Sequence, residues 1–289
     1  EVVVTTGQSK VFNSSRTGSQ ETISRRMIDG VPTINRSWKD LVKLVPSQNG
    51  LSFGGLSSQL NNVTLDGANF NNSFGLGDGT LGGQTGAQPI SLDAVEQIQI
   101  NVSPFDVKYG GFAGGAINTV TKSGTNKSFG SVYEYFKSKD LQGYDVNGVT
   151  LPKQEFNYDL KGFTAGGAII KNKLFFFING EKEERTEPGT LWTASTPTTP
   201  ANGITVSQAT KADLDALTNF LVTKYNYNPG AYEGYSYGSK SQRLSTKIDW
   251  NINDKNTFTL KYNYLRSSAD IAASNSGSVN STYGRRPTT

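Results

Sequence analysis

Side chains that carry out covalent or metal chemistry are scarce in this sequence. Its 289 residues include no His and no Cys, against 28 Lys plus Arg and 24 Asp plus Glu. Without those two residue types the chain has no zinc site, no thiol nucleophile, no Ser-His-Asp triad and no disulfide. No Ser, Asp or Glu has an activating partner near it in the sequence. We therefore predict that the protein is not an enzyme and that it has no catalytic residue, no metal site and no cofactor.

Two glycine-rich segments and one acidic segment resemble ligand loops. Residues 77–82 (GDGTLG) match the G-x-G-x-x-G pattern, but no strand precedes them and no amphipathic helix follows, so a dinucleotide site is not expected. Residues 110–115 (GGFAGG) can cradle an anion, although close backbone packing explains them more simply. Glu181, Glu183 and Glu184 can hold a hard cation, but a solvated strand end is the preferred interpretation.

The most ligand-like segment is residues 69–74 (NFNNSF). Its aromatic rings alternate with side-chain amides, and together these groups can stack on and hydrogen-bond to a sugar or a peptide. The alternative is a polar loop anchored by two buried phenylalanines. The candidate ligand-binding residues are Asn69, Phe70, Asn71, Asn72 and Phe74.

Composition and charge narrow the class of protein. Only 35% of the residues are hydrophobic and 18% charged, against about 45–50% and about 25% in ordinary soluble domains. Gly, Ser, Thr and Asn make up the difference, and they favour turns and polar strands. The net charge of +4 has no long basic run, so nucleic acid is not an expected partner. A spanning helix needs about 18 consecutive apolar residues, which the chain lacks, whereas a spanning strand needs about 9–11 alternating ones.

The clearest periodicity lies near the C-terminus. Apolar residues alternate in two segments joined by a short Asn/Asp turn at residues 253–256, the pattern of a β-hairpin. One face carries Leu244, Ile248, Trp250, Ile252, Phe258, Leu260, Tyr262 and Tyr264, and the other carries Arg243, Lys247, Asp249 and Lys261. The aromatic residues suit the interfacial girdle of an outer-membrane barrel, and the charges suit its water-filled interior. A hairpin of a soluble sandwich is the alternative.

Three more strands precede this hairpin. Residues 158–170 and 174–185 form a second hairpin around the turn at 171–173, and residues 129–139 form a fifth strand. The turns are short, while the links at 140–157 and 186–240 are long, which is the layout of outer-membrane barrels. Within the longer link, residues 211–225 read as a helix with Leu214, Leu217, Leu221 and Val222 on one face. Five strands cannot close a barrel, so further strands of the parent chain or another protein must cover the open edges.

The N-terminal part has different patterns. A helix is expected at residues 37–46, with Ser37 as its N-cap and Trp38, Leu41, Leu44 and Val45 on its inner side. A strand running into a turn is expected at 62–67, and further strands at 98–102 and 116–122, with one helical turn within 91–96. Short mixed elements with many glycines predict a compact α+β domain.

Four segments of this part resemble a known family. Residues 62–68 (NVTLDGA), 89–98 (PISLDAVEQI), 102–110 (VSPFDVKYG) and 114–126 (GGAINTVTKSGTN) are similar to the plug domain of TonB-dependent outer-membrane transporters, most closely the Oar-like branch. The resemblance extends to residue 268 and includes the first barrel strands. The first five residues, Glu1, Val2, Val3, Val4 and Thr5, resemble the TonB box.

The resemblance implies a domain organisation. Residues 1–6 are the TonB-box-like segment, residues 7–126 the α+β plug, and residues 127–289 the first five or so antiparallel transmembrane β-barrel strands, with long extracellular loops at 140–157, 186–240 and 269–289. A complete barrel of this family has about 22 strands, so this chain is an incomplete portion of one. The upstream carboxypeptidase-regulatory-like domain common in Oar-like chains is absent from the sequence.

The resemblance also implies a function. It predicts energised uptake across the outer membrane of a Gram-negative bacterium, with the plug facing the periplasm and TonB, ExbB and ExbD as partners. The ligand is an oligosaccharide, a peptide or chelated iron, since the lack of His disfavours direct metal binding. Outer-membrane lipid is a further partner, and a surface lipoprotein or other envelope subunits are candidates. Two alternatives are a non-transporting surface protein on the same barrel, either an adhesin or a subunit of an envelope complex, and a soluble β-rich binding module.

Overall fold

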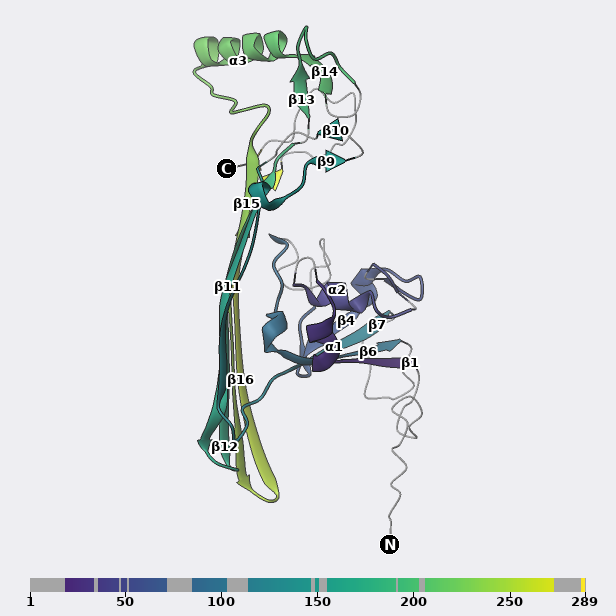
Figure 1. Ribbon diagram of the computed structural model, residues 1–289, viewed down its shortest axis with the longest axis vertical. Coiled ribbons are helices and arrows are strands. Elements are labelled where there is room, and N and C mark those ends of the chain that lie inside the picture. Colours follow the sequence, from purple (N-terminus) through teal and green to yellow (C-terminus); the bar gives the residue numbers. More distant parts are fainter. Residues whose placement is uncertain are drawn as a thin grey trace. The chain divides into compact units, whose positions relative to one another are not determined.

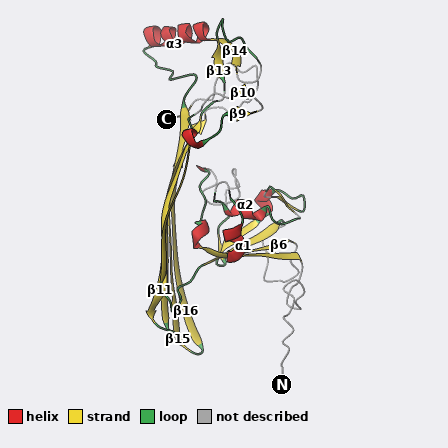
Figure 2. Cartoon of the chain, viewed as in Figure 1, coloured by secondary structure: helices red, strands yellow, loops and turns green. Residues whose placement is uncertain are grey.

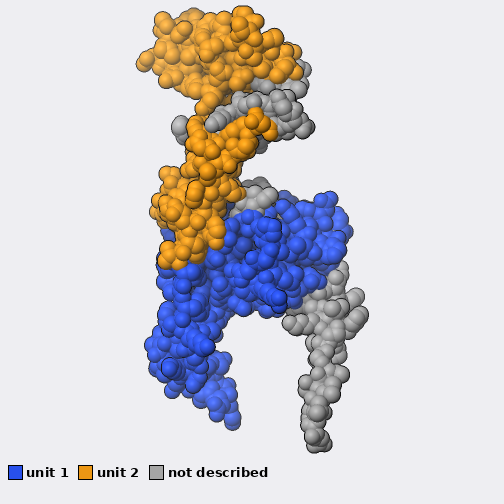
Figure 3. Space-filling model, viewed as in Figure 1, with its two compact units in different colours: residues 1–131, 163–181, 243–265 blue, residues 132–162, 182–242, 266–289 orange. Residues whose placement is uncertain are grey.

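A computed structural model gives the fold of this chain. It describes residues 19–33, 36–46, 48–50, 52–71, 85–102, 114–146, 149–150, 155–190, 192–202, 206–272 and 287–288. The chain divides into two compact units (Figure 3). The first comprises residues 1–131, 163–181 and 243–265, and the second comprises residues 132–162, 182–242 and 266–289. No helix in the described ranges is long and apolar enough to cross a membrane.

The N-terminal part of the first unit is built on a five-stranded mixed sheet, the N-terminal sheet. Its strands are β1 (Ser19–Ser24), β4 (Asn62–Leu65), β5 (Ala68–Asn69), β6 (Val95–Val102) and β7 (Gly115–Thr121). They lie in the order β1-β6-β7-β4-β5, and only the pair β4–β7 is parallel. The predicted strand and turn at 62–67 and the predicted strands at 98–102 and 116–122 are thus confirmed. The predicted helical turn within 91–96 is the 3₁₀ turn η3 (Leu92–Ala94).

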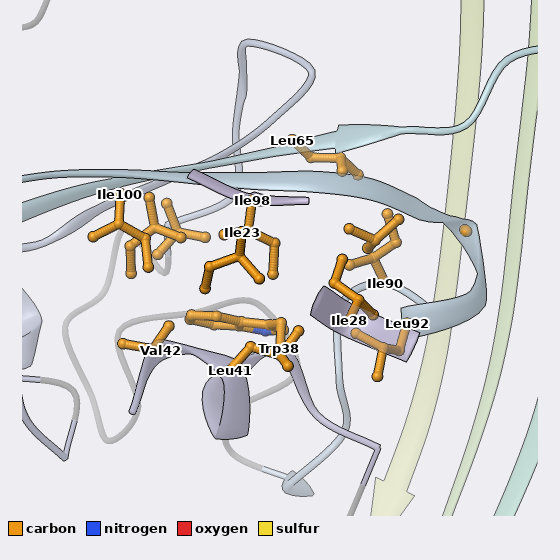
Figure 4. Close-up of a cluster of buried hydrophobic side chains, with 14 of the residues drawn as sticks. Ile23, Ile28, Trp38, Leu41, Val42, Leu65, Ile90, Leu92, Ile98 and Ile100 are labelled. Atoms are coloured by element: carbon orange, nitrogen blue, oxygen red, sulfur yellow. The ribbon is translucent and has the colours of Figure 1, made fainter. Parts of the chain in front are cut away.

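Two short helices and the sheet enclose the hydrophobic core. They are α1 (Arg25–Gly30) and α2 (Trp38–Val42); the other short elements are β2 (Gln48–Asn49), β3 (Ser52–Phe53) and the 3₁₀ turn η1 (Ser58–Leu60). Figure 4 shows Trp38, Leu41 and Val42 facing Ile23 and Ile98 of the strands. All five side chains are at most 3% exposed, so this core alone can hold the sheet and helices together.

The predicted helix at 37–46 is shorter than expected. Ser37 caps it as predicted, accepting a hydrogen bond from Lys39 N at 3.1 Å. The helix ends at Val42, however, and residues 43–46 form turns. Leu44 therefore leaves the helical face that holds Leu41 and is 41% exposed, so its predicted place on the inner side is wrong.

Two glycine positions are fixed by the backbone or by close packing. Asp66 and Gly67 turn the chain from β4 to β5 with φ of 51° and 87°, a left-handed conformation that Gly adopts without strain. A Cβ on Gly115 would lie 2.6 Å from the ring of Phe53. This contact supports close packing as the explanation for the described end of the 110–115 glycine run.

A second sheet of five long strands, the long sheet, contains the predicted hairpins. Its strands are β8 (Phe129–Ser138), β11 (Asn157–Ile170), β12 (Leu174–Pro188), β15 (Ser236–Asn253) and β16 (Asn256–Ala269). Their order is β16-β15-β12-β11-β8, and the strands run side by side in Figures 1 and 2. Among the described strands, β16 and β8 have open edges, so the sheet does not close on itself here.

The two faces of β15 differ as its alternation predicts. Ser241, Arg243 and Ser245 are only 5–6% exposed, whereas Ile248 and Trp250 are 39% and 41% exposed. We call the face with Ile248 and Trp250 the outward face of the strand and the other its inward face. A strand with exposed apolar residues on one face and buried polar residues on the other is typical of an outer-membrane barrel rather than of a soluble sandwich.

The long connections contain small elements of their own, all within the second unit. They are η4 (Lys139–Leu141), β9 (Asp145–Val146) with β10 (Val149–Thr150), β13 (Thr193–Ser195) parallel to β14 (Val206–Thr210), α3 (Lys211–Tyr225), and β17 (Ile271–Ala272) with β18 (Pro287–Thr288). Helix α3 matches its predicted bounds, but it buries none of its residues. Beyond it, the hydrogen bond from Tyr232 Oη to Asp215 raises the pKa of Tyr232 to about 12.

Helix α3 depends on its N-cap because no core holds it. Thr210 Oγ1 accepts from Asp213 N at 3.1 Å and donates to Asp213 Oδ2 at 2.7 Å. We expect Thr210→Ala to destabilise the helix by about 1 kcal/mol. Faster hydrogen exchange of the amides at 211–214 would measure the loss, and Thr210→Ser should keep them protected. Unchanged exchange in Thr210→Ala would show that the cap does not hold the helix.

Candidate functional site

The N-terminal sheet domain contacts the long sheet through polar side chains inside the first unit. Ser91 precedes η3, and its Oγ accepts a hydrogen bond from Asp93 N at 3.1 Å as the cap of that turn. The same hydroxyl donates to Glu181 Oε1 of β12 at 2.6 Å. Ser91 is 1% exposed, and its one hydroxyl both caps the start of the turn and binds a strand ninety residues away in sequence.

Glu181 is neutralised by an arginine on the next strand of the sheet. Arg243 Nε of β15 lies 3.1 Å from Glu181 Oε2, and the two side chains are 4% and 2% exposed. Arg243 Nη1 also donates to Gln88 O at 3.2 Å. Since burying a charge costs several kcal/mol unless it is paired and hydrogen-bonded, these four residues form one interdependent unit. We call Gln88, Ser91, Glu181 and Arg243 the polar network.

An arginine of the N-terminal domain holds the turn that carries Ser91. Arg25 Nη1 donates to Leu92 O and to Val95 O, both at 2.9 Å. Its Nη2 lies 3.8 Å from Asp93 Oδ1. The N-terminal domain therefore fixes the position of Ser91 through contacts that do not involve Glu181.

A second polar contact joins the N-terminal sheet to β16. Asp66 Oδ1 accepts from Thr121 N at 2.9 Å, and Asp66 Oδ2 accepts from Thr121 Oγ1 at 2.6 Å. Lys261 Nζ lies 3.4 Å from Asp66 Oδ2. The Asp-Gly turn of the NVTLDGA segment thus ties β4 to the end of β7 and presents its carboxylate to a lysine of the long sheet.

The three glutamates that suggested a cation site, Glu181, Glu183 and Glu184, bind other side chains instead of converging on one point. Glu181 and Glu183 are each 7% exposed, so the expected solvated strand end is wrong for both. Glu183 lies 3.2 Å from Arg185 Nη2, and Glu184 lies 2.9 Å from Lys182 Nζ. Within the described ranges no cluster of three or more acidic side chains is placed to hold a metal ion. Alternation along β12 puts Glu184 on the face opposite to Glu181 and Glu183, which separates the three carboxylates.

The predicted ligand-binding segment is only partly described. Asn69 is exposed, and Phe70 packs against the core of the N-terminal sheet. Asn71 Oδ1 accepts from Val63 N at 2.7 Å, and its Nδ2 donates to Asn62 Oδ1 at 2.9 Å. The structure thus brings Asn71 onto β4, where its amide closes the strand. The other predicted residues lie outside the described residues: Asn72, Phe74, the box residues Glu1, Val2, Val3, Val4 and Thr5, and the 77–82 glycine motif.

Sequence reasoning placed Arg243 on the polar face of its strand but did not find its partners. The sequence did contain hints of these partners. Alternation along its strand places Glu181 on the inward face, as it does Arg243, and Ser91 belongs to the family-like segment PISLDAVEQI. No local pattern links three positions so far apart in sequence. Only the strand order β15-β12 brings Arg243 beside Glu181.

The fold and these contacts define a class of protein. A family profile described as an outer membrane beta barrel domain matches residues 120–289. The chain belongs to this outer-membrane β-barrel family, and its location is the outer membrane of a Gram-negative bacterium, as the sequence predicts.

Particular relatives are TonB-dependent transporters and receptors. The TonB-dependent transporter Oar of Myxococcus xanthus is 33% identical over an alignment of 153 residues, which covers 49% of this chain and 14% of that protein. The siderophore receptor PirA from Acinetobacter baumannii superposes on 88% of this chain with a TM-score of 0.56 and 17% identity. The outer membrane transporter YddB from Escherichia coli superposes on 88% with a TM-score of 0.57 and 13% identity.

These comparisons confirm the resemblance to TonB-dependent transporters that the sequence indicates. This chain spans 32% and 33% of the two solved structures and 14% of Oar, so it corresponds to a part of each. At 17% and 13% identity the solved structures show the fold alone. The relatives are transporters and receptors rather than enzymes, which agrees with the scarcity of catalytic residue types.

Proposed function

We propose that this chain is the N-terminal part of a TonB-dependent outer-membrane transporter or receptor that takes up a ligand with energy supplied through TonB, ExbB and ExbD. The observation that carries the proposal is the 33% identity with the TonB-dependent transporter Oar over about half of this chain. An oligosaccharide, a peptide or an iron chelate is the class of ligand. Residues 69–74, with Asn69 exposed, are the first candidates to contact it.

In this proposal residues 7–126 are the plug and the long sheet is the first part of the barrel wall. The hydrophobic core of the N-terminal sheet is built mostly from its own elements, and Phe177 of β12 packs into it from the wall. Besides Phe177, the N-terminal domain meets the wall through ion pairs and hydrogen bonds, at Glu181, Arg243, Lys261 and Asn172. Water can replace such contacts when a plug moves, whereas a large apolar interface would hold it in place.

The proposal is tested at the first residues of the chain. An extended box can pair with a strand edge of TonB through backbone hydrogen bonds alone. We expect deletion of residues 2–5 from the full-length parent protein to weaken binding of the purified periplasmic domain of TonB by about 100-fold or more, a loss of about 3 kcal/mol. Titration calorimetry in detergent measures this affinity.

The matched control removes four residues elsewhere. Deletion of residues 197–200, in a turn of the second unit, should leave TonB binding unchanged. Equal TonB affinity of the intact protein and the box deletion would refute the coupling role of residues 1–5. In cells, uptake that persists without TonB would refute energised transport altogether.

A second candidate function is a non-transporting surface protein, either an adhesin or a subunit of an envelope complex. The observation that favours it is helix α3, which leaves Leu217, Phe220 and Val222 between 43% and 49% exposed. Deletion of residues 186–240 separates the two candidates. If the deletion abolishes adhesion or assembly, and uptake is unaffected by loss of TonB, the surface protein is supported. If the deletion abolishes TonB-dependent uptake, the transporter is supported.

A further inference from the structure

Two cations, Lys240 and Arg266, lie together on the outward face of the hairpin β15–β16. Lys240, Gln242, Arg266 and Ser268 are all exposed, and together with Ser241 and Ser267 they line a cavity of about 220 Å³. In the described part of the chain neither Lys240 nor Arg266 forms an ion pair. The nearby carboxylates already have donors, because Glu184 binds Lys182 at 2.9 Å and Asp270 Oδ2 accepts from Gly238 N at 2.7 Å.

Strand register brings the two cations to the same face. Asp270 N donates to Gly238 O at 2.9 Å, so these two residues are opposite each other across the hairpin. Counting along both strands from this pair sets Lys240 opposite Ser268 and Gln242 opposite Arg266. Residues directly opposite in an antiparallel pair point to one face with Cβ atoms about 4.5–5.5 Å apart. The four side chains therefore form one compact patch with two positive charges, an amide and a hydroxyl. Glu184 of β12 lies near enough for the charge of Lys240 to act on its carboxylate, which Lys182 also binds.

The patch lies where the outward face changes from apolar to polar. Alternation along β15 carries the outward face from Ile252 through Ile248 to Leu244, and then to Gln242 and Lys240. A strand crosses the hydrocarbon layer in about 9–11 residues, which residues 244–252 nearly fill. Lys240 and Arg266 thus fall at the level of the lipid head groups. The turn at residues 254–255 is at the other end of the hairpin, and short turns mark the periplasmic side of such barrels.

We propose that Lys240, Gln242, Arg266 and Ser268 bind the phosphate group of a phosphorylated lipid in the outer leaflet of the outer membrane. Arginine and lysine bind phosphate oxygens through charge-assisted hydrogen bonds, and the amide and hydroxyl add neutral donors. A lipid rather than free phosphate is the ligand because the apolar residues below the patch contact its acyl chains. This inference rests on membership of the outer-membrane β-barrel family and goes beyond the transport proposal.

Native mass spectrometry of the full-length parent protein in detergent tests the site. The added lipid is bis-phosphorylated lipid A, and fully dephosphorylated lipid A and inorganic phosphate are added in parallel. We expect Lys240→Ala/Arg266→Ala to retain at least about tenfold less lipid A than the unaltered protein. The control Lys247→Ala/Lys255→Ala removes two lysines from the inward face and the turn of the same hairpin, and should retain lipid A normally. Heat-modifiable gel mobility checks that each variant is folded.

Three results would overturn the proposal. Retention of lipid A by folded Lys240→Ala/Arg266→Ala at the level of the control would show that the patch does not bind it. Equal retention of dephosphorylated lipid A would show that the phosphate is not recognised. Displacement of lipid A by an equimolar amount of inorganic phosphate would identify a free-anion site instead. Because none of these measurements involves TonB, their outcome is independent of the transport proposal.

Discussion

Arg243→Leu is expected to lower the free energy of unfolding by about 3–5 kcal/mol, the usual cost of removing one partner from a buried ion pair. The substitution removes the arginine counter-charge from buried Glu181, and it also removes the donor to Gln88 O. Urea unfolding of the full-length parent protein in detergent, followed by tryptophan fluorescence, measures the loss. Glu181→Leu should be similarly destabilising because it leaves Arg243 without its counter-charge.

The double variant separates charge burial from packing. In Glu181→Leu/Arg243→Leu no charge remains uncompensated, so stability should recover most of the loss of either single variant. A surface pair makes a useful comparison: Lys182→Ala breaks the exposed ion pair with Glu184 and should cost less than about 1 kcal/mol. Single Arg243 and Glu181 variants that cost no more than Lys182→Ala would contradict a buried, interdependent network.

Leu260→Arg is expected to destabilise the membrane-inserted protein by about 2–4 kcal/mol. Leu260 is 55% exposed in the chain and lies on the outward face of β16, midway along the apolar run from Phe258 to Tyr264. At that height a guanidinium group has neither water nor a protein partner to satisfy it. Equilibrium unfolding in lipid vesicles measures the effect, because the lipid must be present for the penalty to arise.

The matched control is on the same strand. Asn263 is exposed and lies on the inward face of β16 by alternation. Asn263→Arg should change stability by less than about 1 kcal/mol, since an inward-facing charge meets water rather than lipid. If the two variants were equally stable in vesicles, the outward face would not be in contact with hydrocarbon.

Some elements were predicted from sequence because their residues follow a clear local pattern. Alternation predicted β15, β16 and β11, an apolar run after a tight turn predicted β12, and the helical spacing from Lys211 to Tyr225 predicted α3 with its bounds. The N-terminal strands β4, β6 and β7 were predicted for the same reason. In each case the local pattern and the tertiary environment favour the same structure. The secondary structure of such a segment can therefore be predicted from its own residues alone.

Other elements had no readable pattern. Strand β1 and helix α1 were not predicted, because each contributes a single residue, Ile23 or Ile28, to the core. Strand β1 exists because it pairs with β6, where Ile23 lies opposite Ile98. The side chain of Leu44 was misplaced because the helix ends two residues before it. Pairing with a distant strand and the place where a helix stops are decided by packing rather than by local sequence.

The sequence by itself determined the class of this protein. The alternation of apolar and polar residues and the family-like segments sufficed to predict an outer-membrane β-barrel protein. Only the tertiary structure decided which polar residues act together, because Ser91, Glu181 and Arg243 come from three elements far apart in the chain. Glu181 was expected to be solvated and is buried instead. Its partner Arg243 comes from another strand, and strand order is a property of the whole fold.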